Sequence, residues 1–191
     1  STLLVINQLL NSSNELTINP EKMSGQYDLT FVGVSKLEQL NLSSTTTGIN
    51  SLSVLQSDCL LGLKLLTDGV INFCHIDECK SFQTLSSHKP IKTLKIANSG
   101  LKNNKNQLVT DDQNSSEKRS LIIDAQLKDL VLSDCDFTDF QLTHKAKLQL
   151  IRCLYLKHVD LPSTDQITCE GFVPPALIGL TEVKINESYI K

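Results

Sequence analysis

Short alternating groups of apolar residues recur along this chain at similar spacings. One frame has apolar residues at its first, fourth, sixth and last positions, and its ninth position is a serine, a cysteine or a valine. Its four clear copies cover residues 91–101, 127–137, 151–161 and 180–190. Alternate side chains of a strand point to opposite faces, so the centre of each copy predicts a short strand with one buried face. The recurrence indicates an internal repeat.

Weaker copies precede these four. Residues 37–42 keep the strand positions of one copy, and residues 16–18 mark an earlier one. Between these and residue 91 two registers compete, one over residues 60–65 and one over residues 71–76. They lie too close together for both to be full repeats, and the first gives the more even spacing along the chain.

Residues 127–137 also match the consensus of the leucine-rich-repeat family, L-x-x-L-x-L-x-x-N/C-x-L, with Cys135 at the asparagine or cysteine position. The other clear copies have Ser99, Val159 and Ser188 there. Over nearly its whole length the chain therefore resembles an irregular, divergent member of this family. It is similar to the cytosolic arrays of F-box-type and other scaffold proteins rather than to the regular extracellular ones.

The resemblance implies an α/β leucine-rich-repeat solenoid with one curved parallel sheet of about seven short strands and an irregular or helical convex side. Leu94, Leu130, Leu154 and Val183 are then expected on stacked neighbouring strands. Residues 1–191 are expected to form a single domain, compatible with a fragment of a longer protein, with the polar residues 102–119 as an inserted loop. The alternative is a doubly wound α/β domain, but the chain shows neither clear amphipathic helices nor a glycine-rich phosphate turn.

Composition narrows the class of protein. Of the 191 residues, 40% are apolar and 20% are charged, and the mean hydropathy is -0.08. These values argue against a disordered chain and against a membrane protein. The net charge of -3 and the pI near 5.8 argue against nucleic acid or anionic lipid as the partner.

The six cysteines bear on the compartment. No C-x-x-C motif occurs, and Cys135 occupies an apolar repeat position, where a free thiol acts as a small hydrophobe. The first residues do not read as a signal peptide. We therefore expect a reducing, intracellular location, cytoplasmic or nuclear. A secreted recognition ectodomain is the alternative.

No constellation of residues indicates catalysis, so we expect no enzyme activity, no cofactor and no metal. The sequence lacks G-x-S-x-G and H-E-x-x-H motifs. Cys74, His75 and Cys79 lack a fourth metal ligand, and Asp134 with Asp136 fits a solvated turn. An enzyme of a parallel β-fold stays a less favoured alternative.

The variable residues of the strands are the expected contact surface, because solenoids commonly bind partners on their concave sheet. We expect a protein-protein interaction module or scaffold with a protein partner of some acidic character and without a small-molecule substrate. The candidate partner-binding residues, expected to form one column across adjacent strands with His158 just beyond it, are Lys95, Val131, Tyr155, Lys157, His158 and Lys184.

Overall fold

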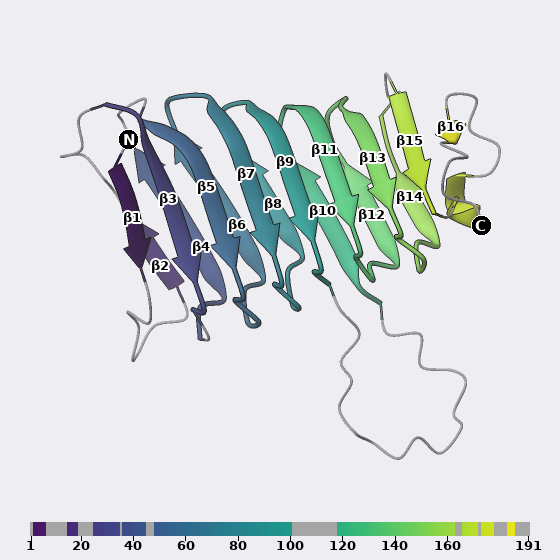
Figure 1. The fold of residues 1–191 in the computed structure, drawn as a ribbon, viewed down its shortest axis with the longest axis horizontal. Helices are drawn as coiled ribbons and strands as arrows, with labels where there is room; N and C mark the ends of the chain where they lie inside the picture. Colours follow the sequence, from purple (N-terminus) through teal and green to yellow (C-terminus); the bar gives the residue numbers. More distant parts are fainter. Residues whose placement is uncertain are drawn as a thin grey trace, which may run out of the picture.

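The computed structural model is a solenoid in which nearly every rung contributes one strand to each of two parallel sheets (Figure 1). It describes residues 2–6, 15–18, 25–34, 36–44, 48–100, 118–162, 166–171, 173–177 and 183–185. The expected inserted loop lies mostly outside the described residues, which resume at Lys118.

Over the ranges given above, sheet A contains nine strands and sheet B contains seven. The strands of sheet A are β1 (Thr2–Ile6), β3 (Tyr27–Val32), β5 (Ile49–Leu55), β7 (Ile71–Asp77), β9 (Ile91–Ala97), β11 (Leu127–Ser133), β13 (Lys147–Ile151), β15 (Gln166–Glu170) and β16 (Val183–Ile185). The strands of sheet B are β2 (Glu15–Ile18), β4 (Gln39–Ser44), β6 (Gly62–Thr67), β8 (Thr84–Ser87), β10 (Ser120–Asp124), β12 (Asp139–Leu142) and β14 (His158–Asp160). Among the described residues the helical element is the short η1 (Pro175–Leu177).

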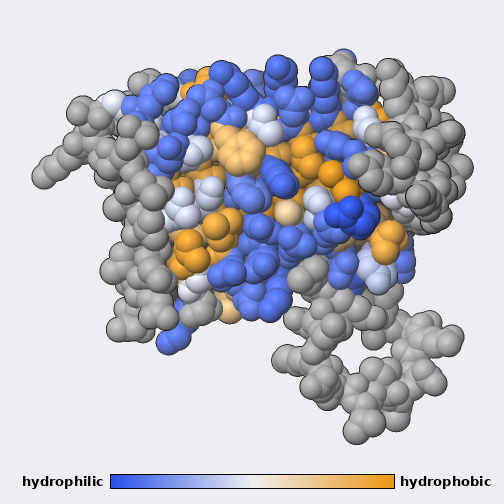
Figure 2. Space-filling view, viewed as in Figure 1, coloured by the Kyte–Doolittle hydropathy of each residue, from blue (hydrophilic) through white to orange (hydrophobic). Residues whose placement is uncertain are grey.

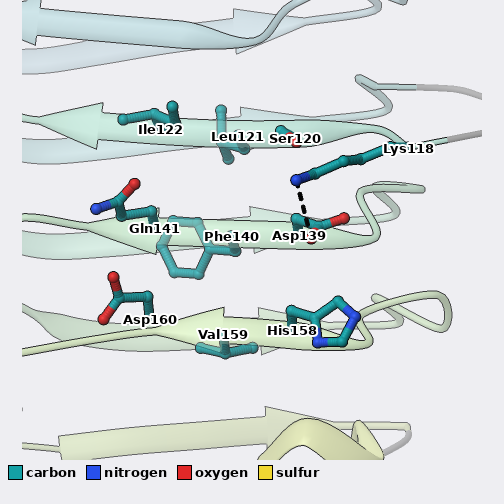
Figure 3. Close-up of a pocket in the computed structure, with 10 residues that line it drawn as sticks. All are labelled: Lys118, Ser120, Leu121, Ile122, Asp139, Phe140, Gln141, His158, Val159 and Asp160. Atoms are coloured by element: carbon teal, nitrogen blue, oxygen red, sulfur yellow. Dashed lines mark ion pairs between the residues drawn. The ribbon is translucent and has the colours of Figure 1, made fainter.

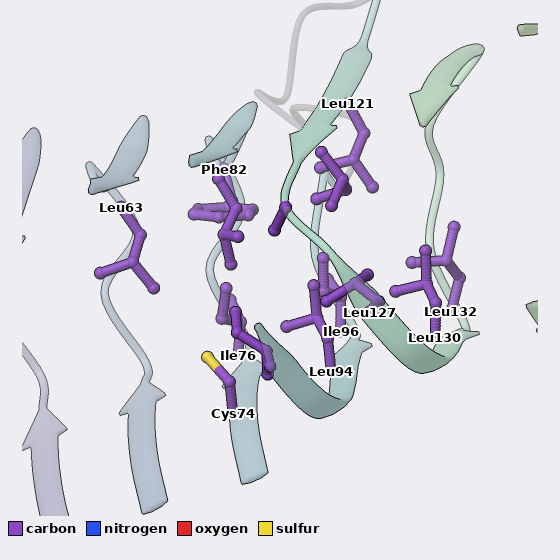
Figure 4. Packing of buried hydrophobic residues seen from close by; sticks show 14 of the residues in the cluster. Leu63, Cys74, Ile76, Phe82, Leu94, Ile96, Leu121, Leu127, Leu130 and Leu132 are labelled. Atoms are coloured by element: carbon purple, nitrogen blue, oxygen red, sulfur yellow. The ribbon is translucent and has the colours of Figure 1, made fainter. Parts of the chain in front are cut away.

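The core lies between the two sheets, where the inward side chains of both pack against each other (Figure 4). Strand pairing stacks like on like, so that Leu130 lies beside Leu94 in sheet A and Leu63 beside Leu85 in sheet B. All four side chains are at most 2% exposed. No rung buries its leucines alone, so stability comes from stacking on the neighbouring rungs.

The chain leaves sheet A through a left-handed residue in each rung from β3 to β15. These residues are Gly33, Gln56, Glu78, Asn98, Asp134, Arg152 and Gly171, all with positive φ. The bend leaves the strand ladder intact, because the amide of Asp134 still donates to the carbonyl of Ile151 at 2.9 Å. A left-handed conformation costs a residue with a Cβ roughly 1–2 kcal/mol, so the regular ladder must outweigh that cost at each corner.

The next position points inward and carries a small residue: Val34, Ser57, Cys79, Ser99, Cys135 or Cys153, all buried. Ser99 Oγ accepts a hydrogen bond from the amide of Cys79 at 3.2 Å and donates to the carbonyl of Ala97 at 2.7 Å. Cys135 Sγ donates to the carbonyl of Ser133 at 3.3 Å. In the frames at 91–101 and 127–137 the ninth position therefore bonds to the backbone at the turn, whereas Val159 lies in β14 and Ser188 lies outside the described residues.

The prediction of a solenoid is confirmed, but the side expected to be irregular or helical is a second parallel sheet. One rung spans 23 residues between Val34 and Ser57 and 20 between Cys79 and Ser99, with a strand on each side. The preference for residues 60–65 over 71–76 was wrong, because both segments are strands: 60–65 overlaps β6 of sheet B, whereas 71–76 lies in β7, the neighbour of β9 in sheet A. The strands of both sheets have the same apolar-x-apolar pattern. The repeat frame therefore could not distinguish strands of sheet A from strands of sheet B.

The expected stack of four strands is correct only for Leu94 and Leu130, which pair directly. Leu154 lies in a turn with 53% of its surface exposed, and β13 occupies the neighbouring place in the sheet. Val183 pairs with Ile167 of β15 rather than with a strand around residue 154. In the frame at 151–161, Leu156 is buried as the pattern requires, but it lies in the corner after Cys153 rather than in a strand.

Candidate functional site

The outer face of sheet A presents a column of aligned side chains. Its central members, in register from β5 to β15, are Ser53, His75, Lys95, Val131, Gln149 and Thr168. All are partly exposed, because the strand period of two turns their neighbours Leu94 and Leu130 into the core. Lys95 and Val131 are therefore brought together as expected, and the backbone of Lys184 pairs in register with that of Thr168.

The other three predicted contacts do not belong to this column. Tyr155 and Lys157 lie in the segment between β13 and β14, and His158 begins β14 at the edge of sheet B. Tyr155 is 47% exposed, and the guanidinium carbon of Arg119 lies 5.7 Å from its ring centre. The single column was wrong for these residues because residues 152–157 form the corner after β13 rather than a strand.

An aromatic side chain that the repeat frame did not identify lies beside the column. Phe73 of β7 is 37% exposed, and its ring centre lies 5.9 Å from that of His75. It belongs to the neighbouring outward column, in register with Thr93 and Asp129. Figure 2 shows this face as a mosaic in which apolar patches interrupt the polar side chains.

His75 is the titratable group most affected by this surface. Its Nε2 is buried without a hydrogen bond, and Asp77 Oδ2 lies 4.0 Å away. Partial burial lowers the pKa of His75, Lys95 lowers it further, and the Asp77 carboxylate opposes both. The imidazole is therefore held in its neutral form on a face that carries lysines.

Charge is separated along the strands of sheet A. Carboxylates gather where the strands end, and they are engaged by neighbours: Asp77 accepts from Asn98 at 2.9 Å, and Glu170 accepts from Gln149 at 2.7 Å. Asp134 accepts two hydrogen bonds from Arg152, which lower the pKa of the carboxyl. The three carboxylates at the strand ends therefore have hydrogen-bond partners within the chain, and Asp134 is paired with a cation.

Lysines gather where the strands begin. Lys92 of β9, Lys128 of β11 and Lys147 of β13 are all exposed. None of the three makes an ion pair within the described ranges, whereas Lys80 beyond the strand ends pairs with Asp58 at 2.9 Å. A signal for this row existed in the sequence, since Lys92 and Lys128 hold the second position of their frames.

A second feature is a shallow groove of about 250 Å³ on the outer side of sheet B, over β10, β12 and β14 (Figure 3). Ser120, Asp139 and His158 pair in register across it. Asp139 lies between the other two and interacts with Lys118 at 3.7 Å. A serine nucleophile needs histidine next to it with the carboxylate behind, so this order does not form a catalytic relay.

The cysteine and histidine cluster of the sequence does not converge on one point. Cys74 and Cys79 are buried in the interior, whereas His75 is on the outer face. Burial raises the pKa of both thiols to about 12. Within the described residues no group of three or more potential ligands is placed to hold a metal ion.

The described residues include no helix long and apolar enough to span a bilayer. Comparison with known proteins gives no match to any family model, to any curated protein or to any solved structure. The fold by itself defines the chain as a parallel β-solenoid with two sheets.

Proposed function

We propose that this chain is a protein-protein interaction module, a scaffold that binds its partner on the outer face of sheet A. The observation that carries the proposal is the combination, on one regular sheet surface, of partly exposed apolar side chains with lysines that make no ion pair among the described residues. Phe73 and Val131 supply apolar contact area, and Lys95 lies between them in the strand order. Aromatic side chains with polar surroundings are typical of binding hot spots.

The regular sheet supports this use. Backbone ladders fix the outward columns on both sides of Val131, so the surface is preorganised and loses little entropy on binding. We also propose that Tyr155, Lys157 and His158 make polar contacts with the partner, in a separate region beside sheet B.

Two further assignments are proposals. Membership of the leucine-rich-repeat family is carried by the repeat frame, most clearly at residues 91–101 and 127–137. An intracellular location is supported by the free thiols, of which Cys74, Cys79 and Cys135 are fully buried parts of the packing.

The test is differential capture from a cell extract with three immobilised proteins: the unaltered chain, Val131→Glu and the control Leu66→Glu. Leu66 is 45% exposed on β6, so the control places the same charge on the opposite sheet. Proteins retained by the unaltered chain and the control should be lost by Val131→Glu. Loss of a hot-spot contact costs at least about 2 kcal/mol, some thirtyfold in affinity.

The captured protein is then purified and titrated against all three forms. Circular dichroism and thermal unfolding establish that each variant retains its fold. Equal affinity for Val131→Glu and the unaltered chain would contradict the proposed surface.

A further inference from the structure

The lysines at the beginnings of three successive strands of sheet A are exposed and make no ion pair with any residue that the structure describes. Lys92 and Lys128 occupy corresponding places in β9 and β11, each between residues that pair across the two strands. Lys147 begins the next strand, in register with Asp129. We call Lys92, Lys128 and Lys147 the lysine row.

Placing like charges on neighbouring strands is unfavourable, because strands in a sheet lie only about 4.8 Å apart. The preceding rungs show the alternative at the same position. There Asn72 donates to Asn50 at 2.7 Å, and Asn50 donates to Asp28 at 2.9 Å. The side-chain amides of this ladder bond to one another and to Asp28, whereas Lys92 and Lys128, which continue it, make no ion pair among the described residues.

In the part of the chain that the structure describes, no carboxylate forms an ion pair with the row. Asp129 is the nearest in register, but it makes no ion pair with Lys147 within 4.0 Å among the described residues. The carboxylates of Asp77, Asp134 and Glu170 lie at the opposite ends of the strands and bind their own neighbours. The positive charge is therefore available to a ligand.

We infer that the lysine row binds an acidic, partly apolar peptide segment of a protein partner; this inference rests on the proposed function. Carboxylates of the segment lie over the row, and its apolar side chains contact Phe73 and Val131 on the same face. A nucleic-acid backbone is charged along its whole length, so it would also meet the carboxylates at the strand ends. A peptide places its acidic residues only over the strand beginnings.

The size of the surface sets the length of the segment. From β7 to β13 the sheet advances by three strand spacings, about 14 Å, which about five residues of extended chain span at roughly 3.3 Å each. A random peptide library of about ten residues therefore covers the site with margin.

The experiment selects such a library on three intact proteins. They are the unaltered chain, the row variant Lys92→Glu/Lys128→Glu/Lys147→Glu, and a control that reverses Lys36, Lys64 and Lys118 in or beside strands of sheet B. The unaltered chain and the control should enrich peptides that combine Asp or Glu with apolar residues. For a selected peptide, fluorescence anisotropy should show affinity lower by at least about tenfold in the row variant. Added salt should weaken the binding, because exposed charges are screened.

Several results would overturn the inference. Selection of no peptides, of peptides without an acidic excess, or of the same peptides by the row variant would each do so. Tighter row-dependent binding of a short single-stranded DNA than of the selected peptide would assign the row to nucleic acid. If the row variant does not fold, Lys92→Gln/Lys128→Gln/Lys147→Gln replaces it.

Failure of the inference is distinguishable from failure of the proposed function. If Val131→Glu abolishes capture from extract but the row substitutions do not change it, the proposed binding surface stands and only the inference of an acidic partner fails. If neither Val131→Glu nor the row substitutions change capture, both the proposed binding surface and the inference of an acidic partner fail.

Discussion

The contact between Gly100 and Phe137 offers a direct test of how the rungs stack on either side of residues 101–117. Gly100 follows the corner after β9, with a φ of 64°, and Phe137 belongs to the corner of the next rung, where it is 1% exposed. A Cβ added to Gly100 would lie 2.3 Å from Phe137 Cε1 and 2.6 Å from Cδ1. Substitution Gly100→Ala therefore forces the buried ring or the backbone to move.

The magnitude follows from two terms. A left-handed alanine costs roughly 1–2 kcal/mol, and overpacking a buried site adds about 1–3 kcal/mol. We expect Gly100→Ala to lower the free energy of unfolding by about 2–5 kcal/mol. Gly25→Ala is the matched control, because Gly25 has a φ of 93° but no atom within 4 Å of the added Cβ. Both changes reduce the entropy of the unfolded chain equally, so their difference isolates the clash.

Denaturant unfolding followed by circular dichroism measures both variants and the double variant Gly100→Ala/Phe137→Leu. The smaller leucine should relieve the clash, giving a favourable coupling energy of about 1 kcal/mol or more in the double-mutant cycle. Equal destabilisation by Gly100→Ala and Gly25→Ala, with no coupling, would refute the stacking of these two rungs.

Three other outcomes are expected. In the folded protein only Cys59 should react rapidly with a thiol reagent, because the other five cysteines are buried. All six should react after denaturation. Rapid reaction of more than one thiol in the native state would argue against the packed interior. Because the pKa of His75 is lowered below 6.5 in the folded state, the unfolded state takes up the proton first and stability should fall as pH decreases below about 6.5. His75→Gln should flatten that slope in thermal unfolding between pH 7 and 5, and an unchanged slope would assign it to other groups. Tyr155→Ala should change the free energy of unfolding by no more than about 1 kcal/mol, since its side chain is half exposed and its contact with Arg119 is a surface cation–π pair; the same variant in the capture assay tests whether Tyr155 contributes to binding.

Several local features could be predicted from the sequence. Apolar-x-apolar steps identified the buried faces of β9 and β11, and the pairing of Lys95 with Val131 followed from the repeat frame. The burial of Cys135 also followed, because its thiol occupies an apolar position of the frame. These features depend on contacts within one rung or between equivalent positions of successive repeats.

What the sequence left open is the side of the coil to which each strand belongs. The periodicity of two fixes which side chains are buried, but residues 60–65 and 71–76 satisfy it equally, and only the assembled coil puts them in opposite sheets. In the same way, Tyr155 and Phe73 both stand among apolar residues in the sequence, yet one lies at a corner and the other on the strand face. Thus the chain by itself determined a stacked β-repeat with a buried aliphatic interior. Pairing between rungs decided which sheet each strand joins and which residues share a face. Residues of one binding face are about twenty positions apart in the sequence and become neighbours only when each turn of the coil packs on the turn before it.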